Sequence, residues 1–157
     1  MKSQIKFLTA AVIASMAFAT ACNNNTDNNP DDTTLKGEIP TGTTLTGNIT
    51  ANATLTSGSS YKLSGGLHVK AGNTLTIEPG VTIVAVDDDA PDYILIEQGA
   101  KIDAQGTASN PIVMTSELKK SGAWGGIHIC GRAHTNAGEG VLSEIGNAPY
   151  GGSDDSD

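Results

Sequence analysis

From Leu35 onward, short groups of aliphatic residues alternate with Thr, Ser and Lys, and Gly or Asn interrupts the pattern every few residues. Apolar residues at every second position are typical of a β-strand with one buried face, and no helical period of 3.6 residues is sustained. The pattern therefore predicts an all-β domain built from very short strands. The predicted strands are Tyr61–Leu63, Leu67–Val69, Leu75–Ile77, Val81–Val84, Tyr93–Glu97, Lys101–Ala104, Ile112–Thr115 and Gly126–Cys130.

Strands this short, separated by glycine-rich corners, favour a coil that turns after each strand over hairpins with long paired arms. At one corner, Pro79 and Gly80 suit the two central positions of a type II turn, because proline fixes a negative φ and glycine accepts a positive one. Trp124 stands among small residues and is expected to pack over another corner.

A loose internal repeat supports the coil. The segment Leu67–Val69, followed by Gly72, is repeated as Ile94–Ile96, followed by Gly99, and a third copy begins at Ile127–Ile129. In a β-solenoid each turn buries an inward row of aliphatic side chains against the turns above and below it. The aliphatic pairs of these segments supply such a row.

The copies begin 27 and then 33 residues apart. The added residues collect in 87–92 and 117–122, which we interpret as insertions at corners. The repeat also predicts that Leu75 and Ile77 correspond to Ala100 and Ile102, with a shift of two residues within the unit.

Five segments in a fixed order make the interpretation more specific. They are Leu75–Ile83, Gly99–Gly106, Asn110–Ser116, Gly122–Ile127 and Tyr150–Asp155. Together they resemble a family of Bacteroidetes cell-surface lipoproteins with a right-handed parallel β-helix of the pectin-lyase-like kind, and the resemblance covers residues 67–157. It implies that strands follow the last segment in family members, so a β-helix domain at 35–157 is expected to be incomplete at its C-terminus.

Residues 1–21 predict a lipoprotein signal peptide. Lys2 and Lys6 precede an apolar run at 7–19, and small residues lead into Cys22. The 13 residues of the run are fewer than the roughly 20 that span a membrane, so a cleaved signal is favoured over a retained anchor. We expect Cys22 to carry acyl chains such as palmitate and to hold the protein on the outer membrane, at the cell surface. The alternative is an ordinary secretory signal with an Ala-x-Ala cleavage site.

Residues 22–34 hold the lipidated cysteine and an Asn- and Asp-rich stretch without a core-forming side chain, which predicts a disordered tether. Without Lys2 and Lys6 the chain keeps 7 basic and 17 acidic residues, a formal charge of −10. This charge excludes nucleic acid as a partner. If Cys22 carries lipid, Cys130 has no disulfide partner and is expected to be a buried small hydrophobe.

Two acidic clusters are weak candidates for calcium, which prefers oxygen ligands. Neither has the ligand spacing of a defined calcium loop, and solvated acidic loops are the alternative. The candidate residues are Asp87, Asp88, Asp89, Asp154, Asp155 and Asp157. His68, His128 and His134 lack the spacing and the glutamate of a zinc site, and the first two are expected to point outward because inward-facing aliphatics flank them.

No catalytic residue and no cofactor beyond the possible calcium is predicted, since the chain contains no nucleophile elbow, phosphate loop or paired-cysteine motif. The preferred hypothesis is a non-catalytic surface module for adhesion or glycan contact, because outward Thr, Ser, Asn and Lys suit an extended glycan or protein partner. A truncated product without activity of its own is the second hypothesis. A polysaccharide lyase or hydrolase is the third; it rests on fold alone and would gain support from a groove gathering Arg132, a histidine and an acidic cluster.

Overall fold

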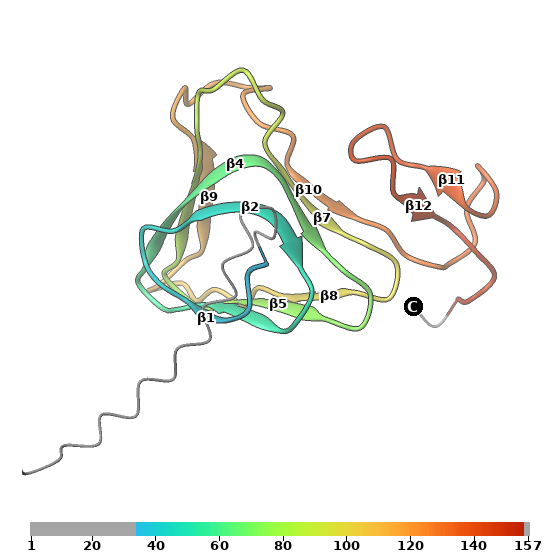
Figure 1. Ribbon diagram of the computed structural model, residues 1–157, viewed down its shortest axis with the longest axis horizontal. Helices are drawn as coiled ribbons and strands as arrows, with labels where there is room; N and C mark the ends of the chain where they lie inside the picture. The colour runs from blue at the N-terminus through green and yellow to red at the C-terminus, as the bar shows by residue number, and fades with distance from the viewer. Residues whose placement is uncertain (1–33, 156–157) are drawn as a thin grey trace, which may run out of the picture.

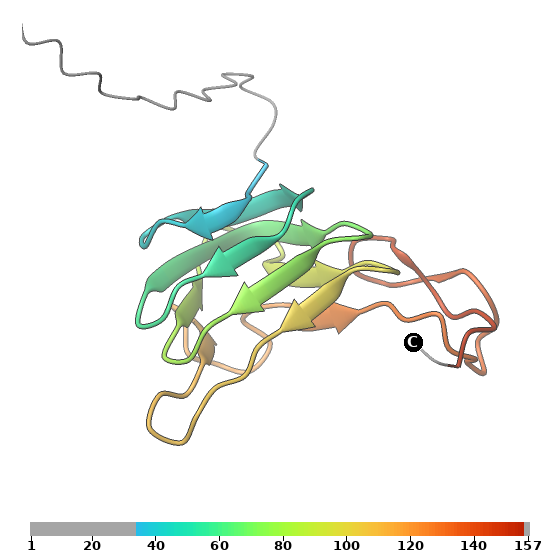
Figure 2. The same cartoon turned by 90° about the horizontal axis from the view of Figure 1, so that it is seen from below.

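The computed structural model describes residues 34–155, whose strands wind around a triangular core (Figure 1). One side of the triangle, side one, is a parallel sheet of four strands (Figure 2). In order they are β1 (Gly37–Ile39), β3 (Ala53–Leu55), β5 (Thr74–Ile77) and β8 (Lys101–Asp103).

Sides two and three share two longer strands that run through the corner between them, β2 (Thr44–Ile49) and β4 (Ser60–Val69). Side two continues from β4 with β6 (Thr82–Ala85) and β9 (Val113–Ser116). Side three continues with β7 (Tyr93–Ile96) and β10 (Ile127–Ile129). The chain thus passes through the three sides in turn, and the predicted all-β parallel β-helix is confirmed.

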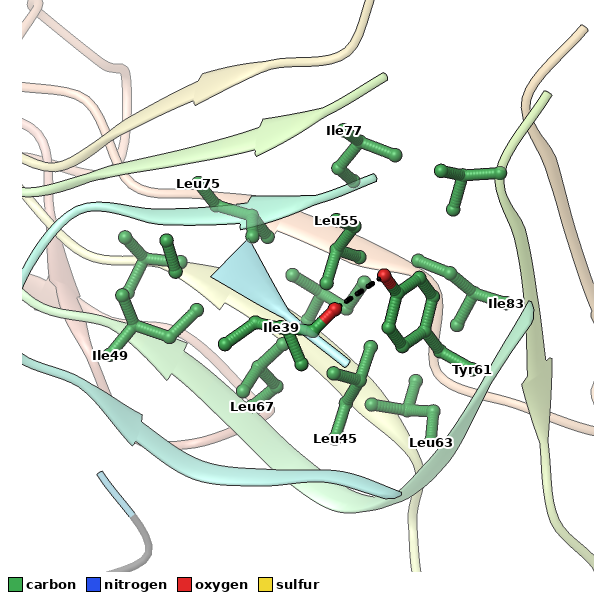
Figure 3. Packing of buried hydrophobic residues seen from close by; sticks show 14 of the residues in the cluster. Ile39, Leu45, Ile49, Leu55, Tyr61, Leu63, Leu67, Leu75, Ile77 and Ile83 are labelled. Atoms are coloured by element: carbon green, nitrogen blue, oxygen red, sulfur yellow. Dashed lines mark hydrogen bonds between the residues drawn. The ribbon is translucent and has the colours of Figure 1, made fainter. Parts of the chain in front are cut away.

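The core is the inward row that the alternation predicts. In β5, Leu75 and Ile77 are buried while Thr74 and Thr76 stay partly exposed. Tyr61 is the largest buried side chain; its hydroxyl donates to the Ile39 carbonyl at 2.8 Å (Figure 3) and accepts from a backbone N–H at 3.1 Å. Burying each Leu or Ile contributes about 1.5–3 kcal/mol, so stacked rows rather than single strands stabilise the coil.

The register confirms most of the repeat and corrects one part. Leu67 pairs with Ile94, and Ile94 with Ile127, as the repeat predicts. Leu75, however, pairs with Ile102, so its predicted match to Ala100 is wrong. The spacing of 27 residues that relates Leu67 to Ile94 also relates Leu75 to Ile102, because the short corner between sides three and one holds no insertion.

The turns grow in length along the chain. Paired residues on side one are separated by 16 residues at β1–β3, by 22 at β3–β5 and by 27 at β5–β8, and on side three β7 and β10 are 33 apart. Figure 1 shows the first turn, in blue and cyan, as the smallest triangle. The predicted insertions account for much of this growth, since 87–92 and 117–122 lie in the loops that follow β6 and β9.

Both of these loops sit on the same corner, between sides two and three. In the two earlier turns a glycine bends a continuous strand there: Gly47 in β2 (φ 77°) and Gly65 in β4 (φ 70°). A positive φ is accessible to glycine at little cost. For this reason the predicted strands Tyr61–Leu63 and Leu67–Val69 are two halves of one bent strand, β4.

The other local predictions are close to the structure. The remaining predicted strands differ from the observed ones by one or two residues at their ends. Gly80 has φ 81°, and Val81 N donates to Glu78 O, as a type II turn requires. Trp124 packs against the core from the corner loop. The strands β1, β2 and β3 were not predicted, because each contributes only isolated apolar residues among Thr, Gly and Asn.

After β10 the chain leaves the coil and forms a lobe on the outside of side three, with a short antiparallel pair, β11 (Val141–Leu142) and β12 (Pro149–Tyr150). Outward-facing Leu95 is fully buried beneath it, together with Cys130 and Ala148. Cys130 is therefore buried as predicted, although it faces outward from the coil, and burial raises the pKa of its thiol.

The last turn leaves part of its inward row open. Ile127 is 39% exposed and Ile129 68%, and within the described residues β8, β9 and β10 each pair along one edge only. Thr34, predicted as the last tether residue, forms a bridge to Asn48 in the first turn. Between residues 34 and 155 no helix is long and apolar enough to cross a membrane.

Candidate functional site

Side one presents a row of outward side chains in register from one end of the sheet to the other. Glu38 pairs with Thr54, Thr54 with Thr76, and Thr76 with Asp103. All four are partly or fully exposed. With strands about 4.8 Å apart, the row is about 14 Å long. We call it the side-one row; it offers hydroxyl and carboxylate groups along the outer face of the sheet.

The outer face of side three carries a cluster of ionisable groups. Lys70 Nζ donates to Glu97 Oε1 at 2.6 Å, and His68 Nδ1 lies 3.2 Å from the same oxygen. Because a carboxylate only accepts, Nδ1 carries the proton of this bond, and a second hydrogen bond joins Nε2 to the Tyr93 hydroxyl at 3.0 Å. Outward-pointing His128 follows in the next turn, with its ring 6.4 Å from that of Tyr93.

The cluster depends on close packing around Tyr93. A Cβ added at Gly66 would lie 2.5 Å from the Tyr93 hydroxyl, and one at Gly146 would lie 3.3 Å from it. The Tyr93 hydroxyl therefore points into protein atoms. The arrangement suits a structural hydrogen-bond chain better than a base that must reach a substrate.

Burial is the largest effect on the Glu97 carboxyl and opposes its ionisation, but the hydrogen bonds from Lys70 and His68 together outweigh it and hold the pKa of Glu97 below its usual range. A depressed carboxyl pKa contributes stability that is present above the unfolded-state pKa, about 4.3, and is lost as the pH falls through the folded-state pKa.

We expect Glu97→Gln to lower the free energy of unfolding by about 0.5–1 kcal/mol at pH 7, a modest effect because Lys70 is partly exposed. The difference from wild type should decrease as the pH falls through the folded-state pKa of Glu97, because the carboxylate then becomes protonated in the folded protein as well. Urea unfolding at pH 7, 5 and 3 measures this. An equal difference at all three pH values would contradict the assigned cause.

The acidic corner between sides two and three contains the first set of calcium candidates. Asp88 accepts a hydrogen bond from Ser64 at 2.6 Å, and Asp92, which is almost completely buried, accepts one from Gly65 N at 2.6 Å. Burial raises the pKa of Asp92, and Asp88 adds to the increase, while the bond from Gly65 opposes it. Asp87 and Asp89 are exposed in the same loop.

The second set lies in the lobe. His134 Nδ1 is 2.8 Å from Asp155 Oδ1, and this hydrogen bond, with another from the His134 backbone, holds the pKa of Asp155 below its usual range. The backbone N–H of Asp154 donates to Arg132 O at 3.1 Å. In residues 34–155 no three His, Cys, Asp or Glu residues come together as metal ligands. Asp157 and Cys22 lie outside the described residues, so lipidation of Cys22 stays a prediction.

The groove that would favour an enzyme is formed in part. Arg132 lines a recess together with Glu139 and Asp154, but His134 is absent from its lining. The sequence indicated Arg132 and Asp154, and it placed Asp92 beside the first acidic cluster, but it did not identify Gln98 or Tyr93 as parts of a site. Their placement depends on contacts between turns, for which the sequence carries no local signal.

The fold and these surfaces define the class: a parallel β-helix with polar groups arranged on its outer faces. The model of the family described as pectate-lyase like beta helix domain matches residues 47–157. The chain belongs to that family. No curated protein and no solved structure matches the chain.

Proposed function

We propose that this chain is an extracytoplasmic lipoprotein of the Bacteroidetes cell-surface kind, anchored through Cys22, that uses its β-helix as a non-catalytic module for contact with an extended glycan. The observation that carries the proposal is the side-one row, in which Glu38, Thr54, Thr76 and Asp103 align across four strands. Such a row matches an extended polymer, which can form hydrogen bonds in every turn of the coil.

The proposal implies an orientation of the coil. Thr34 lies on the first turn, so an anchor at Cys22 would hold this turn nearest the membrane and the wider turns farther out. The lobe covers the part of side three around Leu95, whereas side one and side two lie away from it (Figure 1). The family name describes a fold that also serves enzymes, and fold alone does not assign an activity.

The anchor is tested by the intact mass and the location of the protein in its native host. We expect an acylated chain starting at Cys22 in the membrane fraction, and a Cys22→Ala variant without acyl mass that leaves that fraction. An unmodified, soluble wild-type protein would contradict the anchor.

Glycan contact is tested by applying the detergent-purified full chain to an array of neutral and acidic glycans. We expect Thr54→Ala with Thr76→Ala to weaken binding about fivefold or more, since each of the two lost hydrogen bonds costs roughly 0.5–1.5 kcal/mol. Thr44→Ala with Thr115→Ala, outward positions on side two, is the matched control and should leave binding unchanged. Equal loss in both double variants would argue against the side-one row as the contact surface.

A second candidate is favoured by the exposed Ile127 and Ile129 and by the unpaired edges of β8, β9 and β10 in the described part of the chain. In this candidate, the chain is the first part of a longer β-helix protein and has no activity of its own. The same mass measurement distinguishes the two candidates. A native product heavier than a chain of 157 residues with its acyl chains would favour the longer protein.

A further inference from the structure

A recess of about 440 Å³ lies between the lobe and the corner that joins sides three and one. Its polar side chains are Gln98, Arg132, Glu139, Ser153 and Asp154. Gln98 belongs to the corner and the other four side chains to the lobe, so the recess exists only because the lobe folds back over the corner. We call it the Arg132 recess.

Specific contacts hold this recess in place. Gln98 Nε2 donates to Gly131 O at 2.9 Å and to Gly151 O at 3.1 Å, which ties the corner to both ends of the lobe. Asp154 N donates to Arg132 O at 3.1 Å. A Cβ at Gly99 would lie 2.9 Å from Arg132 Nη2, so the absence of a side chain there lets the guanidinium approach the corner.

The charges of the recess discriminate among ligand classes. Two carboxylates, Glu139 and Asp154, accompany one guanidinium, Arg132. The net negative charge of the recess would repel a uronate or a phosphate, and the Arg132 guanidinium would repel a calcium ion. The hydroxyl groups of a neutral sugar suit this combination of charges, because the guanidinium donates hydrogen bonds to them and the carboxylates accept hydrogen bonds from them.

The position of the recess links it to the side-one row. Gln98 and Gly99 form the corner that leads directly into β8 (Lys101–Asp103), the strand that ends the row. A glycan lying across the strands of side one can therefore place one residue near the recess. The recess would give that contact a sugar preference, which the row of Thr hydroxyls alone lacks.

We infer that the Arg132 recess is a subsite for a neutral sugar residue, and that it selects neutral glycans over polyuronates. This inference rests on the proposed glycan contact and names its ligand class. Arg132 donates to sugar hydroxyls, and Glu139 and Asp154 accept from them, while Gln98 holds the corner against the lobe.

The test measures affinities of the detergent-purified full chain for gluco-, manno- and xylo-hexasaccharides and for hexagalacturonate by titration NMR. We expect at least one neutral hexasaccharide to bind about tenfold or more tightly than hexagalacturonate. Arg132→Gln should weaken that neutral binding about tenfold or more, because hydrogen bonds to a charged group contribute roughly 1.5–3 kcal/mol. Thermal unfolding monitors the fold of each variant.

Glu139→Gln keeps the shape of the side chain and removes one negative charge, so it tests selectivity even if Arg132→Gln fails to fold. It should improve hexagalacturonate binding about threefold or more, with a smaller change for the neutral ligand. Unchanged affinities in Glu139→Gln, or hexagalacturonate as the best wild-type ligand, would overturn the inference. If neutral glycans bind and only the Thr54 and Thr76 variants weaken them, the proposed function stands and the subsite is wrong; if the wild type binds no glycan, the proposed function itself fails.

Discussion

Leu67→Ala is expected to lower the free energy of unfolding by about 3–5 kcal/mol. Leu67 is fully buried in β4, where it pairs with Gly47 on one side and Ile94 on the other. Removing its side chain loses burial free energy and leaves a cavity that rigid neighbouring turns cannot fill. Because each turn is stable only against its neighbours, the loss should affect the whole coil.

Urea unfolding followed by circular dichroism measures this effect. Leu142→Ala is the matched control, since Leu142 is 58% exposed in the lobe and its truncation should change stability by less than about 0.5 kcal/mol. A loss below about 1 kcal/mol for Leu67→Ala would show that the inward row is not the main source of stability.

Asp92→Ala is expected to lower the free energy of unfolding by about 1.5–3 kcal/mol. Asp92 accepts the hydrogen bond of Gly65 N at the corner where β4 bends, and its own backbone carbonyl accepts from Gly125 N in the next turn. Removing the carboxylate leaves the partly buried Gly65 N–H without this acceptor, which costs about 1–3 kcal/mol. Asp87→Ala, an exposed position in the same loop, should have little effect.

The pH dependence provides a second check. The pKa of Asp92 is raised in the folded protein, so its contribution to stability decreases as the pH rises from the unfolded-state pKa, about 3.9, through the folded-state pKa. Asp92→Asn keeps an acceptor for Gly65 N but cannot ionise, and should remove this decrease at a small cost in stability. Equal pH profiles for wild type and Asp92→Asn would contradict the assignment.

Alternation and spacing are sufficient to predict the coil. Leu67, Ile94 and Ile127 follow one another in the sequence at intervals set by whole turns, so the amino-acid sequence alone predicts their stacking. The match of Leu75 to Ala100 failed because aliphatic pairs were aligned by composition, whereas the backbone keeps the 27-residue offset through the corner. Hydrogen bonding between corners, such as Gly72 N to Gly99 O, sets that offset.

The candidate sites are harder to predict. Arg132 and Asp154 come together only because the lobe folds back onto side three, where it packs on Leu95. The alternation of apolar and polar residues predicts that Leu95 points outward into solvent, so it gives no sign of this contact. The sequence likewise predicts Tyr93 only as a strand residue. Its place in the hydrogen-bonded cluster depends on Gly66 and Gly146, which lie in other segments and have no side chain to block its ring. These are tertiary contacts, and the local sequence pattern does not predict them.

The corner between sides two and three has a practical consequence for protein engineering. In the first two turns the strand bends at one glycine in this corner, and in the next two turns a loop of several residues takes its place. The strands on either side of the corner pair in parallel in every turn. The number of residues in 87–91, before the anchored Asp92, and in 117–122 can therefore change without altering the pairing of the strands. Foreign peptide epitopes can therefore be inserted at this corner for display. The inserted residues should project into solvent and leave the coil intact.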